Sequence, residues 1–171
     1  MHELAVTAVG VDRPGIVAAV TEALHERGGN LEDSAMTILG GHFAIVLLVR
    51  TAEEPETLRD ALVTATATFG LTISVSRADA DRRAVQATHL LSVYGVDRPG
   101  IVAGVTRALA DAGANVVDLE TQVLGEETEP VYAMVIELEV EDATAVAENV
   151  AASCEALGVD HTLRTIHAET Y

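Results

Sequence analysis

The stretch Gly-Val-Asp-Arg-Pro-Gly-Ile-Val-Ala occupies residues 10–18 and recurs unchanged at residues 95–103. The two copies are 85 residues apart. At this offset, sixteen of the 24 positions from Gly10 to Asp33 carry the same residue in the second copy. Nine consecutive and seven further identities identify an internal repeat. The 171 residues therefore predict two domains, at 1–77 and 89–171, joined by a linker at 78–88.

Each copy shows the same order of elements by hydrophobic period: a strand, an amphipathic helix, a hairpin, a second helix and a last strand. In the first copy we expect strands at 4–9, 31–39, 42–50 and 71–77, and helices that begin at Pro14 and Pro55 and end before Gly28 and Gly70. In the second copy the strands are expected at 89–94, from Asn115, at 131–140 and at 159–167, with helices from Pro99 to Gly113 and from Asp142 to Gly158. The order βαββαβ, twice, predicts an α+β fold of two ferredoxin-like domains, each an antiparallel sheet with its helices on one face.

The repeated loop between the first strand and the first helix is the strongest candidate for a binding site. Pro14 and Pro99 are expected at the first helical position, where the missing N–H of proline would be unpaired anyway. The loop glycines let the backbone approach a ligand, and the N–H groups after each proline lie at a helix N-terminus, where the dipole favours an anion. The loop therefore predicts a site for a carboxylate.

Two further pairs of side chains extend this site. Asp12 and Asp97 lie beside the predicted anion site and can accept an ammonium group, so each loop offers complementary ends to a zwitterion. Asn30 and Asn115 open the second strand of each copy and carry both a donor and an acceptor for the same ligand across a domain or subunit boundary. Two other interpretations stay open: the aspartates are only helix N-caps, or the turn binds nothing. The spacing Gly-x-x-x-x-Gly does not match the Gly-x-Gly-x-x-Gly of dinucleotide sites.

Composition excludes several classes of function. The chain has 27 acidic and 10 basic residues, a formal charge of −17, and every basic residue is an arginine. The lack of lysine excludes P-loop, Schiff-base and kinase lysines, and the negative charge opposes binding to nucleic acid. The chain has one cysteine, no signal-like start and no apolar run that approaches the roughly 20 residues of a membrane span. These features favour a cytoplasmic protein without membrane contact.

Neither catalysis nor metal binding is indicated by the residues. Cys154 falls on the apolar stripe of a helix, and no Ser-His-Asp or Cys-His arrangement can be recognised. His161 and His167 are roughly 20 Å apart along an extended strand, which is too far for one ion. We expect no cofactor, no metal and no enzymatic activity. The acidic residues at 126, 127 and 129 are interpreted as a solvated loop or as a docking surface for a basic partner.

The motif Asp-Arg-Pro-Gly-Ile-Val-Ala-Ala-Val-Thr-Glu-Ala-Leu, followed by Asn30 six residues beyond Leu24 on a βαββαβ unit, resembles the ACT domain, the amino-acid-sensing module of metabolic regulation. The resemblance covers essentially the whole chain, and the bare pair of units is similar to the family of glycine cleavage system transcriptional repressors. It implies a small amino acid, glycine or similar, bound between modules, and a protein partner rather than DNA. The site residues that it implies are Asp12, Arg13, Pro14, Gly15, Ile16, Asn30, Asp97, Arg98, Pro99, Gly100, Ile101 and Asn115.

The leading hypothesis is a non-catalytic tandem ACT protein that senses an amino acid and regulates a protein partner. A homodimer is expected because exposed sheet edges need cover. Two alternatives are an interaction module without a ligand and a regulatory subunit that acts in trans on a metabolic enzyme. The formal charge is −5 over residues 1–77 and −12 over residues 89–171, which favours the second domain as the half that faces a partner.

Overall fold

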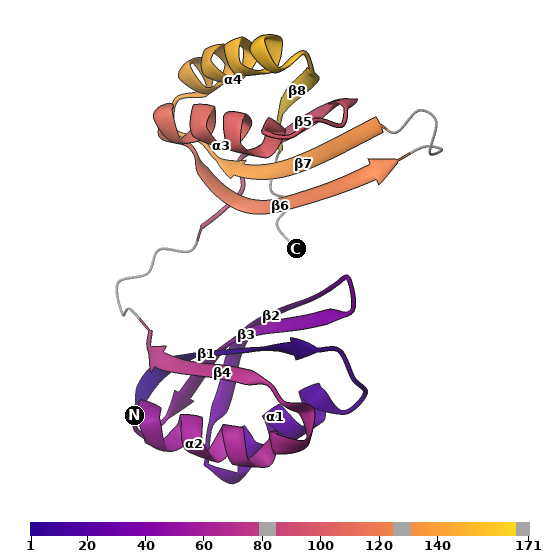
Figure 1. Ribbon diagram of the computed structural model, residues 1–171. Helices are drawn as coiled ribbons and strands as arrows, with labels where there is room; N and C mark the ends of the chain where they lie inside the picture. The colour runs from indigo at the N-terminus through magenta and orange to yellow at the C-terminus, as the bar shows by residue number, and fades with distance from the viewer. Residues whose placement is uncertain (79–84, 125–130, 167–171) are drawn as a thin grey trace. The chain divides into compact units, whose positions relative to one another are not determined.

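A computed structural model of the chain describes residues 1–78, 85–124 and 131–166 (Figure 1). The chain divides into two compact units, Met1–Arg82 and Arg83–Tyr171. Both have the predicted ferredoxin-like βαββαβ order, which confirms the fold class. The division between the units falls inside the segment predicted as a linker, and the exact domain limits stay predictions.

Unit 1 is a four-stranded antiparallel sheet in the order β2-β3-β1-β4 with two α-helices on one face (Figure 1). Its elements are β1 (His2–Val11), α1 (Ile16–Glu26), β2 (Asn30–Leu39), β3 (His42–Thr51), α2 (Pro55–Ala65), the 3₁₀ helix η1 (Ala67–Phe69) and β4 (Thr72–Arg77). Because α1 connects β1 to β2 as a crossover, these two strands run parallel, with the antiparallel β3 between them.

Unit 2 repeats this topology in the order β6-β7-β5-β8. Its elements are β5 (His89–Val96), α3 (Ile101–Asp111), β6 (Asn115–Leu124), β7 (Val131–Glu139), α4 (Ala143–Leu157) and β8 (Asp160–Thr165). As predicted, Asp142 caps α4: its carboxylate accepts from the backbone N–H groups of Thr144 and Ala145. Gly158 then ends the helix in the left-handed conformation, with φ of 63°.

Each unit has its own hydrophobic core between the helices and the covered face of the sheet. Strand β3 shows the origin of this core, because every second side chain from Phe43 to Thr51 is buried and those between are more exposed. The fully buried side chains of unit 1 include Leu4, Ile16, Phe43, Leu47, Leu58 and Leu62, and those of unit 2 include Leu91, Leu109, Met134, Ile136 and Leu138.

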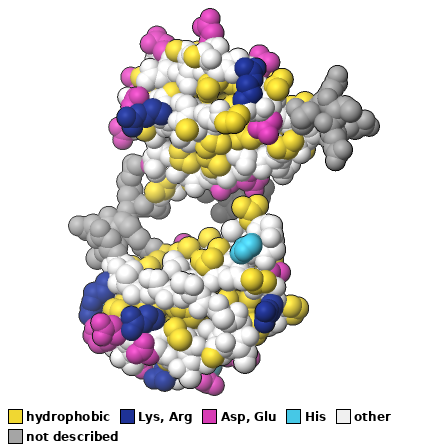
Figure 2. Space-filling view, in the orientation of Figure 1, with side chains coloured by type: hydrophobic (Ala, Val, Ile, Leu, Met, Phe, Trp, Pro, Cys, Tyr) yellow, Lys and Arg dark blue, Asp and Glu magenta, His cyan; other side chains and the backbone are white. Residues whose placement is uncertain are grey.

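The outer strands β2 and β6 are exposed along their whole length. In the register with β3, Met36 lies opposite Ile45 and Ile38 opposite Phe43, so both point to the helical side of the sheet. They are nevertheless 51% and 52% exposed. Figure 2 shows exposed hydrophobic side chains gathered in patches on the visible face of each unit. Each unit therefore presents an apolar sheet edge with which no other described strand pairs.

Three helix boundaries differ from the prediction. Helices α1 and α3 begin at Ile16 and Ile101, two residues after the prolines that were expected to start them. The second helix of unit 1 ends at Ala65 instead of continuing to Phe69, and η1 replaces its last turn. At this break the Thr66 hydroxyl, 1% exposed, donates to the carbonyl of Leu62 at 2.8 Å.

Candidate functional site

The repeated loop forms a tight turn in both units. Gly15 has φ of 96° and ψ of −8°, and Gly100 has 98° and −6°. With proline before it, each glycine occupies the third position of a type II turn, which requires a positive φ there. In unit 1 the N–H of Ile16 donates to the carbonyl of Arg13 at 3.5 Å, as this turn expects. Pro14 and Pro99 therefore set up the turn before the helix, and the prediction that they are the first helical residues is wrong.

The helix after this turn begins without a side-chain cap. Gly15 and Gly100 are the N-cap residues, and their carbonyl oxygens accept from Ala19 and Gly104 at 3.0 and 2.9 Å. Neither Val17 nor Ala18 donates its backbone N–H to a residue that the structure describes. Asp12 and Asp97 do not cap these helices. The amides thus face outward at the positive end of a helix dipole, an arrangement that suits an anion.

The predicted loop residues divide into an exposed set and a buried one. Aspartate, arginine, proline and glycine of the loop are exposed in both units. Ile16 and Ile101 are only 1% and 2% exposed and belong to the cores, so their side chains anchor the loop instead of facing a ligand. The backbone N–H of Asp12 donates to the carbonyl of Gly41 at 2.9 Å, which ties the loop of unit 1 to the turn between β2 and β3.

The structure does not bring the loop and Asn30 together within one unit. Asn30 pairs with Arg50 and lies level with Glu3, whereas the loop follows Val11 at the other end of β1. Nine residues of extended strand separate the two levels, about 30 Å at roughly 3.3 Å per residue. Asn115 in unit 2 lies opposite Glu139, at the end of its sheet away from Asp97. A ligand that touches both the loop and an asparagine must therefore bridge two modules.

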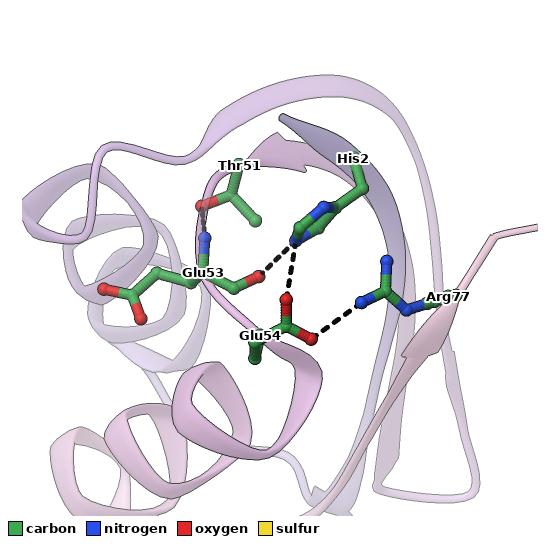
Figure 3. Close-up of polar contacts among 5 residues, drawn as sticks. All are labelled: His2, Thr51, Glu53, Glu54 and Arg77. Atoms are coloured by element: carbon green, nitrogen blue, oxygen red, sulfur yellow. Dashed lines mark hydrogen bonds and ion pairs between the residues drawn. The ribbon is translucent and has the colours of Figure 1, made fainter.

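Asn30 lies near a group of charged contacts at its own end of the sheet. Beside it, Arg50 Nε lies 2.6 Å from Glu32 Oε1. On the same end, His2 Nε2 lies 2.9 Å from the carbonyl oxygen of Glu53 and 3.7 Å from Glu54 Oε1, and Arg77 Nη2 lies 2.7 Å from Glu54 Oε2 (Figure 3). These contacts join the ends of β1 and β4 to the start of α2, which gives them a structural role.

Sequence reasoning missed the contacts between each loop and the segment that ends the second helical region of its unit. In unit 1 the Phe69 ring lies 3.5 Å from the position that a Cβ on Gly15 would occupy. In unit 2, apart from the chain neighbours of Gly100, no atom in the described part of the chain lies within 4 Å of that position on Gly100. Arg98 Nη2 lies 3.3 Å from the Cβ position on Gly158. Gly70 after η1 and Gly158 after α4 signal in the sequence that the chain turns there.

A tyrosine also distinguishes the two loops. Tyr132, 8% exposed, lies opposite Gly95 on β5, where unit 1 pairs Phe43 with Gly10. Burial raises the pKa of the Tyr132 hydroxyl, the negative charge of Asp97 raises this pKa further, and a hydrogen bond with Thr121 lowers it. Because Tyr132 pairs with Gly95, two residues before Asp97, it lies at the loop end of the unit 2 sheet.

Beyond the two loops, the described residues offer few groups with other chemistry. They contain no group of three or more His, Cys, Asp or Glu side chains that could hold a metal ion. Cys154 is fully buried, and burial raises the pKa of its thiol. No helix in this part of the chain is long and apolar enough to cross a membrane. His167 and the acidic residues 126, 127 and 129 lie outside the described ranges.

Comparison with known proteins agrees with this architecture. The family model described as "ACT domain" matches residues 2–76 and again 87–164, so the chain belongs to the ACT domain family. The glycine cleavage system transcriptional repressor of Escherichia coli strain K12 is 33% identical over 131 residues, which cover 75% of this chain and 68% of that protein. The chain is therefore a tandem ACT-domain regulatory protein related to that repressor.

Two solved structures extend the likeness to the whole chain. A protein from Galdieria sulphuraria, described only as an unknown protein, has a TM-score of 0.84 and 32% identity, over 97% of this chain and 99% of that one. A putative glycine cleavage system transcriptional repressor has a TM-score of 0.71 and 23% identity, over 96% and 97% of the two chains. At that identity the second likeness shows the fold alone.

Proposed function

We propose that this protein is a non-catalytic regulator that binds a small amino acid, glycine or similar, at its two loops. Whether the amino acid is bound then controls how the protein acts on a protein partner. The observation that supports this proposal is the repeated type II turn. In both units it leaves first-turn amides, an exposed arginine and an exposed aspartate at the start of an uncapped helix. The name of the E. coli relative suggests a partner that acts in transcription.

The loop can hold both ends of an amino acid. In unit 1 the carboxylate of the ligand accepts from the N–H groups of Val17 and Ala18 and is neutralised by Arg13, while its ammonium group donates to Asp12. Residues 97–103 offer the same groups in unit 2. The short side chain of glycine suits a shallow site of this kind.

Asn30 and Asn115 complete the site from a second module. Antiparallel pairing of β2 with the β2 strand of a second copy reverses one sheet relative to the other, so that Asn30 comes to the end of the sheet where the partner's loop lies. The apolar, unpaired edges of β2 and β6 support such pairing and a homodimer. A light-scattering mass of twice 17.9 kDa is expected, and a monomer mass at high concentration contradicts the dimer.

The size of the ligand limits its affinity. Glycine has about five non-hydrogen atoms, and a ceiling of about −1.5 kcal/mol for each gives about −7.5 kcal/mol, a Kd of a few micromolar at best. This range suits a sensor that follows a metabolite pool and does not suit a permanently held cofactor.

Isothermal titration calorimetry with glycine and the other nineteen amino acids tests the proposal. We expect one or a few small amino acids to bind with micromolar to millimolar Kd, and we expect Asp12→Asn combined with Asp97→Asn to weaken that binding about tenfold or more. The exposed Glu22→Gln on α1 is the matched control and leaves binding unchanged. Absence of heat for all twenty ligands at millimolar concentration overturns the sensor function.

The exposed edges also support a second candidate, an interaction module without a ligand. This candidate predicts that Asn30→Ala with Asn115→Ala leaves partner binding unchanged, whereas the sensor makes partner binding depend on the amino acid. Purification of the chain with its native partner then separates a transcription regulator from a metabolic enzyme that the chain would serve as a subunit in trans.

A further inference from the structure

The same motif has different surroundings in the two units. In unit 2 the Arg98 guanidinium lies against Gly158 at the C-terminal end of α4, with Nη2 at 3.3 Å and Nη1 at 3.6 Å from the position of a Cβ on that glycine. In unit 1 the equivalent glycine, Gly70, has the same left-handed conformation, but apart from its chain neighbours no atom of the described residues lies within 4 Å of its Cβ position. Arg13 therefore does not make the contact that Arg98 makes.

The packing of the helices explains this difference. Gly104 on α3 would place a Cβ 2.9 Å from Leu157 Cδ1, so this glycine lets Leu157, at the end of α4, pack against α3 without a shift of its side chain. Unit 1 has Ala19 at this position of the repeat. Its second helix also stops at Ala65 and continues as η1, from which Phe69 turns its ring towards Gly15. The approach of an α-helical C-terminus to the loop is thus specific to unit 2.

A guanidinium group at the end of α4 is electrostatically favourable. The last carbonyl groups of an α-helix carry the negative end of its dipole, and a cation there is stabilising. Helix α4 runs for 15 residues without interruption up to this end. Arg13 is exposed, and like Arg98 it makes no ion pair or side-chain hydrogen bond with a described residue. Among the described residues, Arg98 lies against the end of a helix in its own unit and Arg13 does not.

We propose that the two loops are unequal, with unit 1 holding the high-affinity site and Arg13 acting as the cation for the carboxylate of the ligand. Arg98 is a positioning residue that docks loop 97–100 on the C-terminus of α4. A carboxylate at the loop of unit 2 must draw Arg98 away from the helix end, so it binds there more weakly. This inference rests on the proposed amino-acid binding and adds to it a preferred site and a stoichiometry of one tight ligand per chain.

Two matched variants, Arg13→Gln and Arg98→Gln, test the inference with glycine as the probe. In calorimetry we expect Arg13→Gln to weaken the tight phase about tenfold to a hundredfold, the loss that accompanies one charge-assisted hydrogen bond, and Arg98→Gln to leave that phase within about twofold. Equal losses in the two variants, or two identical sites in the unchanged protein, overturn the inference.

A second measurement needs no ligand. Amide hydrogen exchange in the full chain is expected to be about two- to fivefold faster over the last turn of α4, residues 154–158, in Arg98→Gln. Arg98→Lys, which keeps a cation, restores most of the protection. Arg13→Gln leaves the exchange of residues 62–70 unchanged. Equal effects of the two glutamine variants on their own helix ends contradict the docking of Arg98.

The two measurements separate this inference from the proposed function. If glycine and the other amino acids bind nowhere on the unchanged protein, the sensor function fails, while hydrogen exchange still decides whether Arg98 is docked. If an amino acid binds but both loops respond alike, the proposed function stands and the inequality of the loops is wrong.

Discussion

At the scale of single residues, the loop depends on a backbone conformation that only glycine adopts easily. Gly15 and Gly100 have φ near 96° and 98°, where an L side chain is strained. We expect Gly15→Ala and Gly100→Ala each to lower the free energy of unfolding by about 1–2 kcal/mol, measured by urea denaturation. Gly40→Asn is the control, because asparagine tolerates the φ of 57° at that position. An alanine variant as stable as the unchanged protein contradicts the requirement of this turn for glycine.

The Tyr132 hydroxyl predicts a pH dependence at the same scale. Burial, then the charge of Asp97, raises its pKa above 10.0 in the folded protein, with Thr121 opposing this shift. The folded state therefore holds this proton more tightly than the unfolded state. The resulting stability is present below pH 10 and is lost as the pH rises above it.

We expect the free energy of unfolding to fall as the pH rises above about 10, and Tyr132→Phe to make that fall less steep. Urea denaturation over this range measures the slope. Tyr94→Phe is the matched control, since that tyrosine is 42% exposed. Equal slopes in the unchanged protein and in Tyr132→Phe show that the buried phenol does not contribute.

At the scale of elements, the second helices of the two units begin in different ways. Asp142 accepts from Thr144 N–H at 3.0 Å and Ala145 N–H at 3.1 Å, whereas Glu54 makes no cap hydrogen bond at the start of α2. Asp142→Ala is expected to destabilise unit 2 by about 1 kcal/mol in urea denaturation. Asp142→Asn keeps the acceptor and should lose only a small part of this free energy of unfolding. Identical effects of the two changes contradict the cap.

The order of elements could be predicted from the sequence because strand and helix periods are distinct along nearly the whole chain. The start of α1 could not be predicted, because proline suits both the first position of a helix and the second position of a type II turn. The positive φ of Gly15 in the structure decides for the turn. The break after Ala65 was missed because Phe69 continues the helical spacing of Leu58 and Leu62.

The candidate site was predictable in part. The loop residues follow from the repeat, and the position of Asn30 follows from topology, since two strands joined by a crossover helix run parallel and the second begins at the far end. The contacts of Phe69 with Gly15 and of Arg98 with Gly158 depend on how the helices pack, which the local sequence pattern does not contain.

At the scale of the whole molecule, each unit has a separate core. Leu62 belongs to the core cluster of unit 1 and Val150 to that of unit 2, and both are fully buried. We expect Leu62→Ala to cost about 2–5 kcal/mol and to speed hydrogen exchange mainly in unit 1, and Val150→Ala to act mainly in unit 2. Uniform faster exchange throughout the chain in either variant shows that the two cores unfold as one.

The 30 Å that separate the loop from Asn30 have a consequence for how the protein would report on a metabolite. A ligand that needs both groups is bound only by an associated pair of modules, so ligand occupancy and self-association form one linked equilibrium. If those modules come from two chains, the apparent affinity for the amino acid rises with protein concentration, and dilution of the protein weakens amino-acid binding. The abundance of the protein in the cell would then set the metabolite level at which it responds.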